Sequence, residues 1–409
     1  MVRSSRQRRK AAMIFILITV FIDMLGIGII IPILPELIRE FVGGSSALAG
    51  RWYGVLAATY AVTQFVFAPL LGALSDRVGR RPVILISLFG LGIDYLIMGF
   101  APTLGWLFVG RLIAGVMGAN VTTANAYIAD VSKPENRARN FGLIGVAFGL
   151  GFIFGPAIGG LLGSIDLRLP FFASAGLALV NWLYGFFVLP ESLPAEKRDV
   201  FRWRKANPVG SLHVLRTYPL VAGLTTAFVF VILAQRGLET VWVLYTGHKF
   251  GWDERANGLS LALVGIMSAI VQGGLVQPVI KRIGERRAVL YGLIWAVVAF
   301  LGYGLATAGW MLLVVIVVGS ISGVAGPAIQ SLVAGSVPPE DQGKVQGGIQ
   351  SLMSLTSIAA PLIFTAGLFS YFTSAGAPVQ LPGAPFLLGA VMYGLAFWSV
   401  LRLFRRMPG

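Results

Sequence analysis

Cysteine is absent from this sequence of 409 residues, histidine occurs only twice, and charged residues make up only 12% of it. A chain without cysteine has no disulfide, no thiolate metal site and no cysteine nucleophile. With only His213 and His248, we expect no imidazole metal cluster either. A soluble globular protein carries about 25% charged residues, so this composition argues against a cytosolic enzyme.

A phosphate-binding loop of the type Gly-x4-Gly-Lys-Ser/Thr is also missing from the sequence. Such a loop holds the phosphates of ATP in P-loop proteins. We therefore expect no ATP hydrolysis by this chain. Together with the low charge content, the sequence leads us to predict no enzymatic activity and no bound cofactor.

Long apolar runs dominate the chain instead. A helix that spans the hydrocarbon core of a bilayer needs about 20 apolar residues. The first run follows a basic stretch that includes Arg8, Arg9 and Lys10, but it is too long for a signal peptide and no small-residue cleavage site follows, so we predict a retained helix. Twelve runs are long enough, near residues 12–36, 50–74, 82–101, 104–129, 140–163, 170–190, 219–246, 256–280, 288–308, 310–336, 346–373 and 383–404.

The basic residues lie between these runs. A nucleic-acid binder spreads such charge over a polar surface, so the net charge of +15 does not indicate a nucleic-acid partner here. Of the 32 lysines and arginines, twenty-five fall on one set of alternate loops and termini, five on the other, and two within runs. Cytoplasmic loops carry the excess of Lys and Arg, so we predict a multi-pass protein of the inner (plasma) membrane with both termini in the cytoplasm.

The longest polar interval, residues 191–217, separates six runs from six. The halves resemble each other at an offset of 205 residues, with VGRR at 78–81 matching IGER at 283–286 and Gly155-Pro156 matching Ala360-Pro361. Such a repeat is typical of transporters that move two bundles about a central site, although so short a match also arises by chance. We predict an all-α membrane protein with six-helix bundles at 1–190 and 218–409, joined by a cytoplasmic linker at 191–217.

Three motifs connect this pattern to a known family. The loop between the second and third runs reads GALSDRVGRR at 72–81, the fourth run carries Arg111 and Gly115, and the fifth carries glycines every fourth residue together with Pro156. Together they resemble the major facilitator superfamily, and the last resembles its proton-driven exporters. This resemblance implies a gate that closes the cytoplasmic side, with Asp76 at the start of the eleventh helix. The gating residues would be Gly72, Asp76, Arg77, Gly79, Arg80, Arg81, Asp130, Gly151, Gly155, Pro156 and Gly159.

Both motif regions also have simpler interpretations. Glycines in the loop permit a tight turn. The glycines of the fifth run lie on one face and form a groove for a close-packed neighbouring helix, while Pro156 removes a backbone donor and permits a bend. Packing and gating therefore remain alternatives for this run. In the second half Lys281 stands where the repeat has Asp76, so we expect the gate to be one-sided.

Further segments resemble the tetracycline/proton antiporters within that superfamily, over nearly the whole chain. They are DYLIM at 94–98, AYIAD at 126–130, TVWVLY at 240–245, FGW at 250–252, Gln342-Gly343, Gln346-Gly347 and LTSI at 355–358. The resemblance implies drug export in exchange for protons. Family members place a histidine and an aspartate where this chain has Ser268 and Ala296, so proton coupling is expected mainly in the first half, and a tetracycline–metal chelate is only one candidate substrate.

Ionisable residues within the predicted helices are few. An ionised side chain at the bilayer centre costs at least about 2.5–3.5 kcal/mol, so each needs a partner or a function. Apolar surroundings favour the uncharged form of a carboxyl, and reversible protonation is what a proton carrier requires. We predict proton coupling by Asp23, Asp94, Arg111 and Glu239, with Asp23 or another polar group of the first helix as the partner of Arg111. The alternatives are structural roles, such as a salt bridge between Glu239 and Arg236, which share a helix face.

Polar and aromatic residues of the same helices are candidates for the substrate site. An amphiphilic substrate needs an apolar wall with a few polar anchors, although amides in membrane helices also serve simply to tie helices together. By resemblance, Asp94 lies at the substrate site. We predict substrate contacts by Asp94, Gln64, Asn125, Gln235, Gln330, Tyr60, Tyr127, Phe228 and Trp242.

The favoured interpretation is therefore a monomeric antiporter that exports an amphiphilic drug by alternating access, with protons as the coupling ion and no resident metal. The alternatives are a transporter of an endogenous metabolite on the same scaffold and a non-transporting receptor or assembly scaffold.

Overall fold

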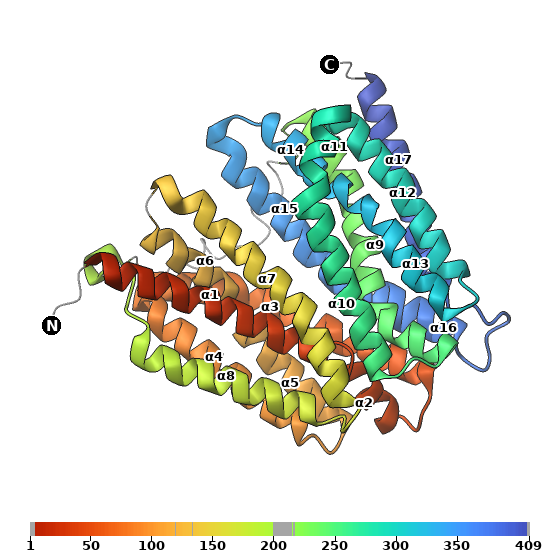
Figure 1. Ribbon diagram of the computed structural model, residues 1–409, viewed down its shortest axis with the longest axis horizontal. Coiled ribbons are helices and arrows are strands. Elements are labelled where there is room, and N and C mark those ends of the chain that lie inside the picture. Colours follow the sequence, from red (N-terminus) through yellow and green to blue (C-terminus); the bar gives the residue numbers. More distant parts are fainter. Residues whose placement is uncertain (1–4, 119, 133, 199–214, 216, 407–409) are drawn as a thin grey trace. The chain divides into compact units, whose positions relative to one another are not determined.

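The computed structural model describes residues 5–118, 120–132, 134–198, 215 and 217–406, and every regular element among them is a helix (Figure 1). Twelve helices in this part of the chain are long and apolar enough to cross a membrane, as the apolar runs predict. The chain forms two compact units. Unit 1 comprises Met1–Leu37, Thr59–Pro208 and Glu254–Ala262, and unit 2 comprises Ile38–Ala58, Val209–Asp253 and Leu263–Gly409.

The predicted division of the chain at 191–217 stays a prediction, and residues 199–214 and 216 of that linker lie outside the described residues. Three helices have residues in both units: α2 (Leu34–Phe41), α3 (Ser46–Val78) and α10 (Glu254–Ile270).

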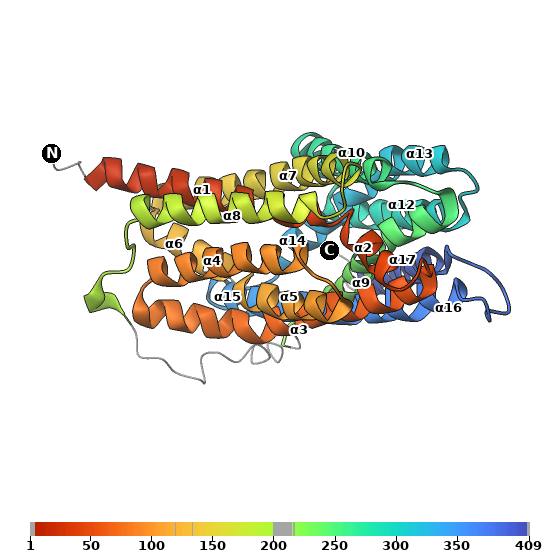
Figure 2. The ribbon, with the colours of Figure 1, turned by 90° about the horizontal axis from the view of Figure 1, so that it is seen from below.

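Unit 1 is built around α1, which packs on α7 and α8, while α8 also packs on α4. The helices α1 and α8 run side by side in both views (Figures 1 and 2). Phe15 of α1, Leu88 of α4 and Tyr127 of α6 are fully buried in one hydrophobic cluster. The remaining elements of this unit are α1 (Ser5–Ile30), α4 (Arg80–Gly99), α5 (Leu104–Met117), α6 (Asn120–Val131), α7 (Pro134–Gly163), α8 (Leu169–Val188) and the short η1 (Ala195–Lys197).

Unit 2 has α9 at its centre, packed on α17 and α15, and α12 also packs on α17. Its core is aromatic: the ring of Trp242 lies 5.4 Å from that of Tyr303, and Tyr245 lies 4.7 Å from Phe386. Its elements are α9 (Pro219–Phe250), η4 (Val271–Leu275), α11 (Val276–Ile283), α12 (Glu285–Leu305), α13 (Gly309–Gly319), η5 (Ser320–Val324), α14 (Ala325–Gly335), α15 (Pro339–Ala360), η6 (Pro361–Phe369), α16 (Ser370–Phe372) and α17 (Ala384–Arg406).

The predicted repeat is visible in the backbone. Gly79 precedes α4 with φ 108° and ψ 158°, and Gly284, 205 residues later, precedes α12 with φ 81° and ψ 159°. Only glycine adopts this region readily. The second match differs, because Pro156 lies within the continuous helix α7 whereas Pro361 begins the π-helical η6.

The glycines of α7 form the predicted groove, and α1 fills it. A Cβ added at Gly155 would lie 2.7 Å from the Cα of Gly28, and one added at Gly151 would lie 2.6 Å from the Cβ of Met24. At Gly159 the added atom would overlap the carbonyl of Ile29. Small residues on both helices thus permit backbone contact, as in other membrane bundles.

Candidate functional site

Asp94 and Arg111 form a buried charge pair in unit 1. The side chain of Asp94 on α4 is fully buried, and the Nη2 atom of Arg111 on α5 lies 3.7 Å from its Oδ2. The same Nη2 donates to the sulfur of Met98 at 2.9 Å. Neither carboxylate oxygen accepts a hydrogen bond from any described residue. When Asp94 is ionised, its buried charge is stabilised mainly by Arg111, because its oxygens accept no hydrogen bond from a described residue. Protonation of Asp94 would therefore change the energy of this pair substantially.

Three other predicted residues surround this pair. The Nε2 of Gln64 donates to the hydroxyl of Tyr60 at 3.1 Å and to the carbonyl of Gly118 at 3.4 Å. The guanidinium of Arg111 lies 5.7 Å from the centre of the Tyr60 ring, in cation–π range. Asp23 is also buried, and Tyr60 is within electrostatic range of Asp23, Asp94 and Arg111. We call Asp23, Tyr60, Gln64, Asp94 and Arg111 the Asp94 cluster.

The pairing within this cluster differs from our expectation. The sequence suggested Asp23 or another group of the first helix as the partner of Arg111, whereas the structure brings the guanidinium to Asp94. Gly110 explains the close approach of α5 to α4: a Cβ at this position would lie 2.9 Å from Oδ1 of Asp94 and 2.7 Å from Cγ of Met98.

The ionisable residues of α9 form the expected local pair. Nη1 of Arg236 lies 2.7 Å from Oε2 of Glu239, and both side chains are about two-fifths exposed. Gln235, the neighbouring residue, is exposed. A single exposed pair on one helix contributes little to stability.

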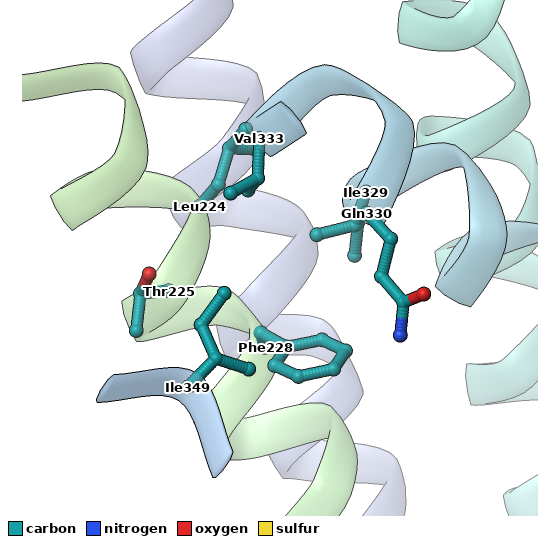
Figure 3. A pocket seen from close by; sticks show the side chains of 7 residues that line it. All are labelled: Leu224, Thr225, Phe228, Ile329, Gln330, Val333 and Ile349. Atoms are coloured by element: carbon teal, nitrogen blue, oxygen red, sulfur yellow. The ribbon is translucent and has the colours of Figure 1, made fainter. Parts of the chain in front are cut away.

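Phe228 and Gln330 line a small pocket within unit 2. Figure 3 shows Thr225 and Phe228 from α9, Gln330 from α14 and Ile349 from α15 around it. The walls are otherwise aliphatic, and the buried hydroxyl of Thr225 has no hydrogen-bond partner among the described residues. The predicted substrate residues are therefore divided between a charged cluster in unit 1 and a mainly apolar pocket in unit 2.

Two aromatic candidates occupy other places. Tyr127 is fully buried in the hydrophobic cluster of unit 1, and its hydroxyl donates to the carbonyl of Pro190 at 2.9 Å. Trp242 is 2% exposed and packs edge-on against Tyr303 in the core of unit 2. Both rings hold helices together rather than facing a cavity, because apolar neighbours on several helices enclose them. Asn125 on α6 is half-buried.

The predicted gating residues Asp76, Arg80 and Asp130 meet at the end of unit 1 where α4 begins. Nη2 of Arg80 lies 2.6 Å from Oδ1 of Asp76, and Nε lies 3.3 Å from Oδ2 of Asp130. Nη1 donates to Oγ of Ser75 at 2.6 Å. The guanidinium is 10% exposed, so one largely buried arginine joins α3, α4 and α6. Gly72 faces open space, Arg77 is exposed, and Arg81 donates to the carbonyl of Phe186 at 2.7 Å.

Glu191 is a member of this region that we did not predict. Its carboxylate accepts the backbone N–H groups of Arg80 at 2.8 Å and Arg81 at 3.2 Å, which are the first residues of α4. It also accepts those of Ser192 at 3.0 Å and Leu193 at 3.1 Å. A carboxylate at a helix N-terminus satisfies free donors and favours the helix dipole. One feature of the sequence could have identified Glu191. It is an acidic residue directly after the sixth apolar run, in a loop on the side predicted to carry the excess of basic residues.

Unit 2 has a related contact at the start of α9. The hydroxyl of Tyr218 donates to Oδ2 of Asp341 on α15 at 2.7 Å, and Lys344 lies 2.7 Å from Oδ1. This hydrogen bond raises the pKa of Tyr218 above its ordinary value. Lys281, at the position equivalent to Asp76, is exposed, so the two halves carry different charges at the equivalent loop. Among the described residues, no group of three or more acidic, histidine or cysteine side chains is placed to hold a metal ion.

Comparison with known proteins gives consistent similarities. A sequence profile described as the Major Facilitator Superfamily matches residues 16–361 and 245–409. The chain is 42% identical to the class C tetracycline resistance protein of Escherichia coli, over 93% of this chain and 94% of that protein. It is 38% identical to the class D protein of Salmonella ordonez (94% and 95%) and 28% identical to multidrug resistance protein 2 of Bacillus subtilis (88% and 90%).

Two solved structures of transporters have similar folds. The human organic anion transporter MFSD10 is similar with a TM-score of 0.67 and 27% identity, over 96% of this chain and 99% of that one. The nucleoside transporter NupG is similar with a TM-score of 0.76 and 13% identity, over 96% and 100%. At 13% identity the second likeness concerns the fold alone.

Proposed function

Because this chain belongs to the major facilitator superfamily, whose fold serves transport across membranes, we propose that it exports a tetracycline-like amphiphilic drug in exchange for protons by alternating access. It is a multi-pass protein of the inner membrane and a transporter rather than an enzyme. Relatives named for tetracycline and multidrug resistance cover nearly its full length, which supports a small-molecule drug as the substrate.

The buried pair of Asp94 and Arg111 carries the proposal of proton coupling. When Asp94 is ionised, Arg111 is its nearby cation at 3.7 Å. When a proton neutralises Asp94, that attraction is lost and the guanidinium of Arg111 needs another partner. A proton and a substrate that compete for this cluster would therefore be exchanged rather than carried together. Each charge that crosses the membrane releases about 2.3 kcal/mol per 100 mV, which is sufficient to drive uphill export.

The second half contributes fewer titratable groups. Ser268 is exposed on α10 and Ala296 is buried on α12, and neither side chain ionises. We therefore assign coupling to Asp23, Asp94 and Arg111 in unit 1, with Glu239 beside Arg236 as the candidate in unit 2. As substrate residues we retain Tyr60, Gln64, Asp94 and Asn125 in unit 1 and Phe228, Gln235 and Gln330 in unit 2. Arg80 with Asp76 and Asp130 would hold the cytoplasmic gate.

Everted membrane vesicles test this proposal directly. Respiration acidifies their interior, and addition of a transported drug should release protons and partly collapse the pH gradient. We expect a response to tetracycline or another amphiphile in a drug panel tested with and without Mg²⁺. Asp94→Asn should abolish it, whereas Asp166→Asn, an exposed loop control, should retain it. Vesicles should contain equal amounts of each variant with equal unfolding temperatures.

Two results would contradict the proposal. A full response by Asp94→Asn would remove this residue from proton coupling, and no response to any compound in the panel would remove drug export. A scaffold protein would give the second result.

A second candidate substrate class is suggested by the 27% identity to an organic anion transporter. Arg111 is a cation beside a carboxylate that becomes neutral on protonation, which would favour an anionic substrate in the protonated state. The same vesicle panel distinguishes the classes, because organic anions would then collapse the gradient while cationic amphiphiles would not.

A further inference from the structure

The end of α11, the start of α12 and the end of α17 lie at one end of unit 2 (Figure 1), and these segments carry seven basic residues. The guanidinium of Arg286 at the start of α12 lies 5.2 Å from the ring of Phe404 near the end of α17, so the two helix ends are adjacent. We call this group the basic end. Its members are Lys281, Arg282, Arg286, Arg287, Arg402, Arg405 and Arg406.

Most cations of the basic end have no ion pair with another described residue. The carboxylate at this end, Glu285, accepts a hydrogen bond from Ser331 of α14, so one of its oxygens is already engaged. Ion pairs with other described residues are lacking for Lys281, Arg282, Arg287, Arg405 and Arg406. These exposed cations lie at the ends of adjacent helices and repel one another. An external anion would relieve that repulsion.

Aromatic rings hold two of these arginines in place. The guanidinium of Arg402 lies 5.3 Å from the centre of the Trp398 ring, one helical turn earlier on α17, and that of Arg286 lies over the ring of Phe404. Arg402 is exposed, and a guanidinium can offer two parallel N–H groups to the two oxygens of a phosphate.

Exposed apolar side chains continue from the arginines along both helices. Trp398 is 57% exposed and Tyr291, four residues after Arg287, is 61% exposed. Farther along are Ile294, Val298 and Leu301 on α12 and Val391 and Leu395 on α17, all of them exposed. In a membrane protein such a face meets acyl chains, and exposed Trp and Tyr mark the level of the headgroups.

We propose that an anionic phospholipid binds here, with its phosphate held by Arg402, Arg405 and Arg287 and its acyl chains along the exposed faces of α12 and α17. Charge complementarity identifies the occupant, since basic pockets between membrane helices bind anionic headgroups. The orientation of the protein in the membrane depends only on an excess of basic residues in the cytoplasmic loops and does not require them to form a site. Here exposed arginines on two packed helices, Arg287 on α12 and Arg402 and Arg405 on α17, are followed along both helices by an exposed apolar face, and this combination provides a binding site in addition.

Native mass spectrometry of the purified full chain tests this site. The protein is titrated in detergent with phosphatidylglycerol, cardiolipin or phosphatidylcholine. We expect tighter retention of the two anionic lipids. Because each arginine contributes about fivefold to affinity for an anionic lipid, Arg402→Gln/Arg405→Gln should weaken their binding at least about tenfold. Arg51→Gln/Arg255→Gln removes the same charge from exposed sites elsewhere and should change binding less than about twofold.

A further variant separates the site from general electrostatics. Trp398→Ala leaves the net charge unchanged but removes the ring under Arg402, so it should also weaken binding of the anionic lipids. All variants should unfold at the wild-type temperature in phosphatidylcholine, which excludes misfolding. Equal retention of phosphatidylcholine, equal losses in the two double variants, or unchanged binding by Arg402→Gln/Arg405→Gln would overturn the proposal.

Discussion

A single carboxylate, that of Glu191, joins the start of α4 to the chain that follows α8. It accepts four backbone N–H groups, of Arg80, Arg81, Ser192 and Leu193. Gly79 lies between α3 and α4, and a Cβ added there would overlap Oε2 of Glu191. Glycine at this position therefore serves two purposes, since it adopts a positive φ and leaves room for the carboxylate.

Loss of this carboxylate should destabilise unit 1. Removal of a side chain that satisfies helix N-terminal donors costs about 0.5–2 kcal/mol, and several donors are affected here. We therefore expect Glu191→Ala to lower the free energy of unfolding by about 2 kcal/mol, measured as a lower midpoint of thermal unfolding in detergent. Glu196→Ala provides the control, because Glu196 is exposed in the nearby η1. Equal midpoints for the two variants would show that the carboxylate contributes nothing.

For the Asp94 cluster, the sequence predicted the residues but not the ion pair between Asp94 and Arg111. The five members of this cluster were all among the predicted site residues: Asp23, Asp94 and Arg111 as charges and Gln64 as an amide within apolar runs, and Tyr60 as an aromatic substrate residue. Their functional roles stay predictions. Which carboxylate meets Arg111 was not predictable, since it depends on how α1, α4 and α5 rotate about their axes. Gly110 allows α5 to approach Asp94 on α4. Because the chain contains many glycines, the sequence does not indicate which of them permits a close helix contact.

At the scale of elements, the contact between α1 and α7 depends on matched glycines. Gly155 lies against Gly28, whereas Gly145 on the same helix faces open space. The sequence predicted that the glycines of α7 would share a face, from their spacing of four residues. It did not identify α1 as the neighbour, because many helices of this chain carry small residues.

This contact yields a matched pair of substitutions. We expect Gly155→Ala to lower unfolding stability by about 1–3 kcal/mol, the usual cost of overpacking, because its Cβ would meet the backbone of α1. Gly145→Ala should leave the midpoint unchanged or raise it, since alanine favours helix more than glycine does. Thermal unfolding of both variants in the same detergent measures the difference. A Gly155→Ala variant as stable as Gly145→Ala would contradict the close contact.

At the scale of the whole molecule, orientation in the membrane remains a prediction from charge. The natural absence of cysteine makes it testable, because single cysteines can be introduced without background. Glu196→Cys lies on the predicted cytoplasmic side, and Gly376→Cys lies in the exposed segment between α16 and α17 on the opposite side. In spheroplasts, a membrane-impermeant maleimide should label Gly376→Cys alone. In everted vesicles the labelling pattern should reverse. Labelling of Glu196→Cys in intact spheroplasts would show that the orientation is opposite to the predicted one.

The membrane class and the twelve helices were predictable from the sequence, because apolar runs of this length are suited to span a bilayer. The repeat was predictable at the glycines before α4 and α12, which share a backbone geometry that favours glycine. The sequence also located the few ionisable groups within the helices. The partners of these groups, the burial of Tyr127 and Trp242 in the cores, the role of Glu191 and the proximity of the basic ends of α12 and α17 became known from the folded structure alone. Those outcomes depend on the rotation and contact of helices distant in the chain, which periodicity along one helix does not specify.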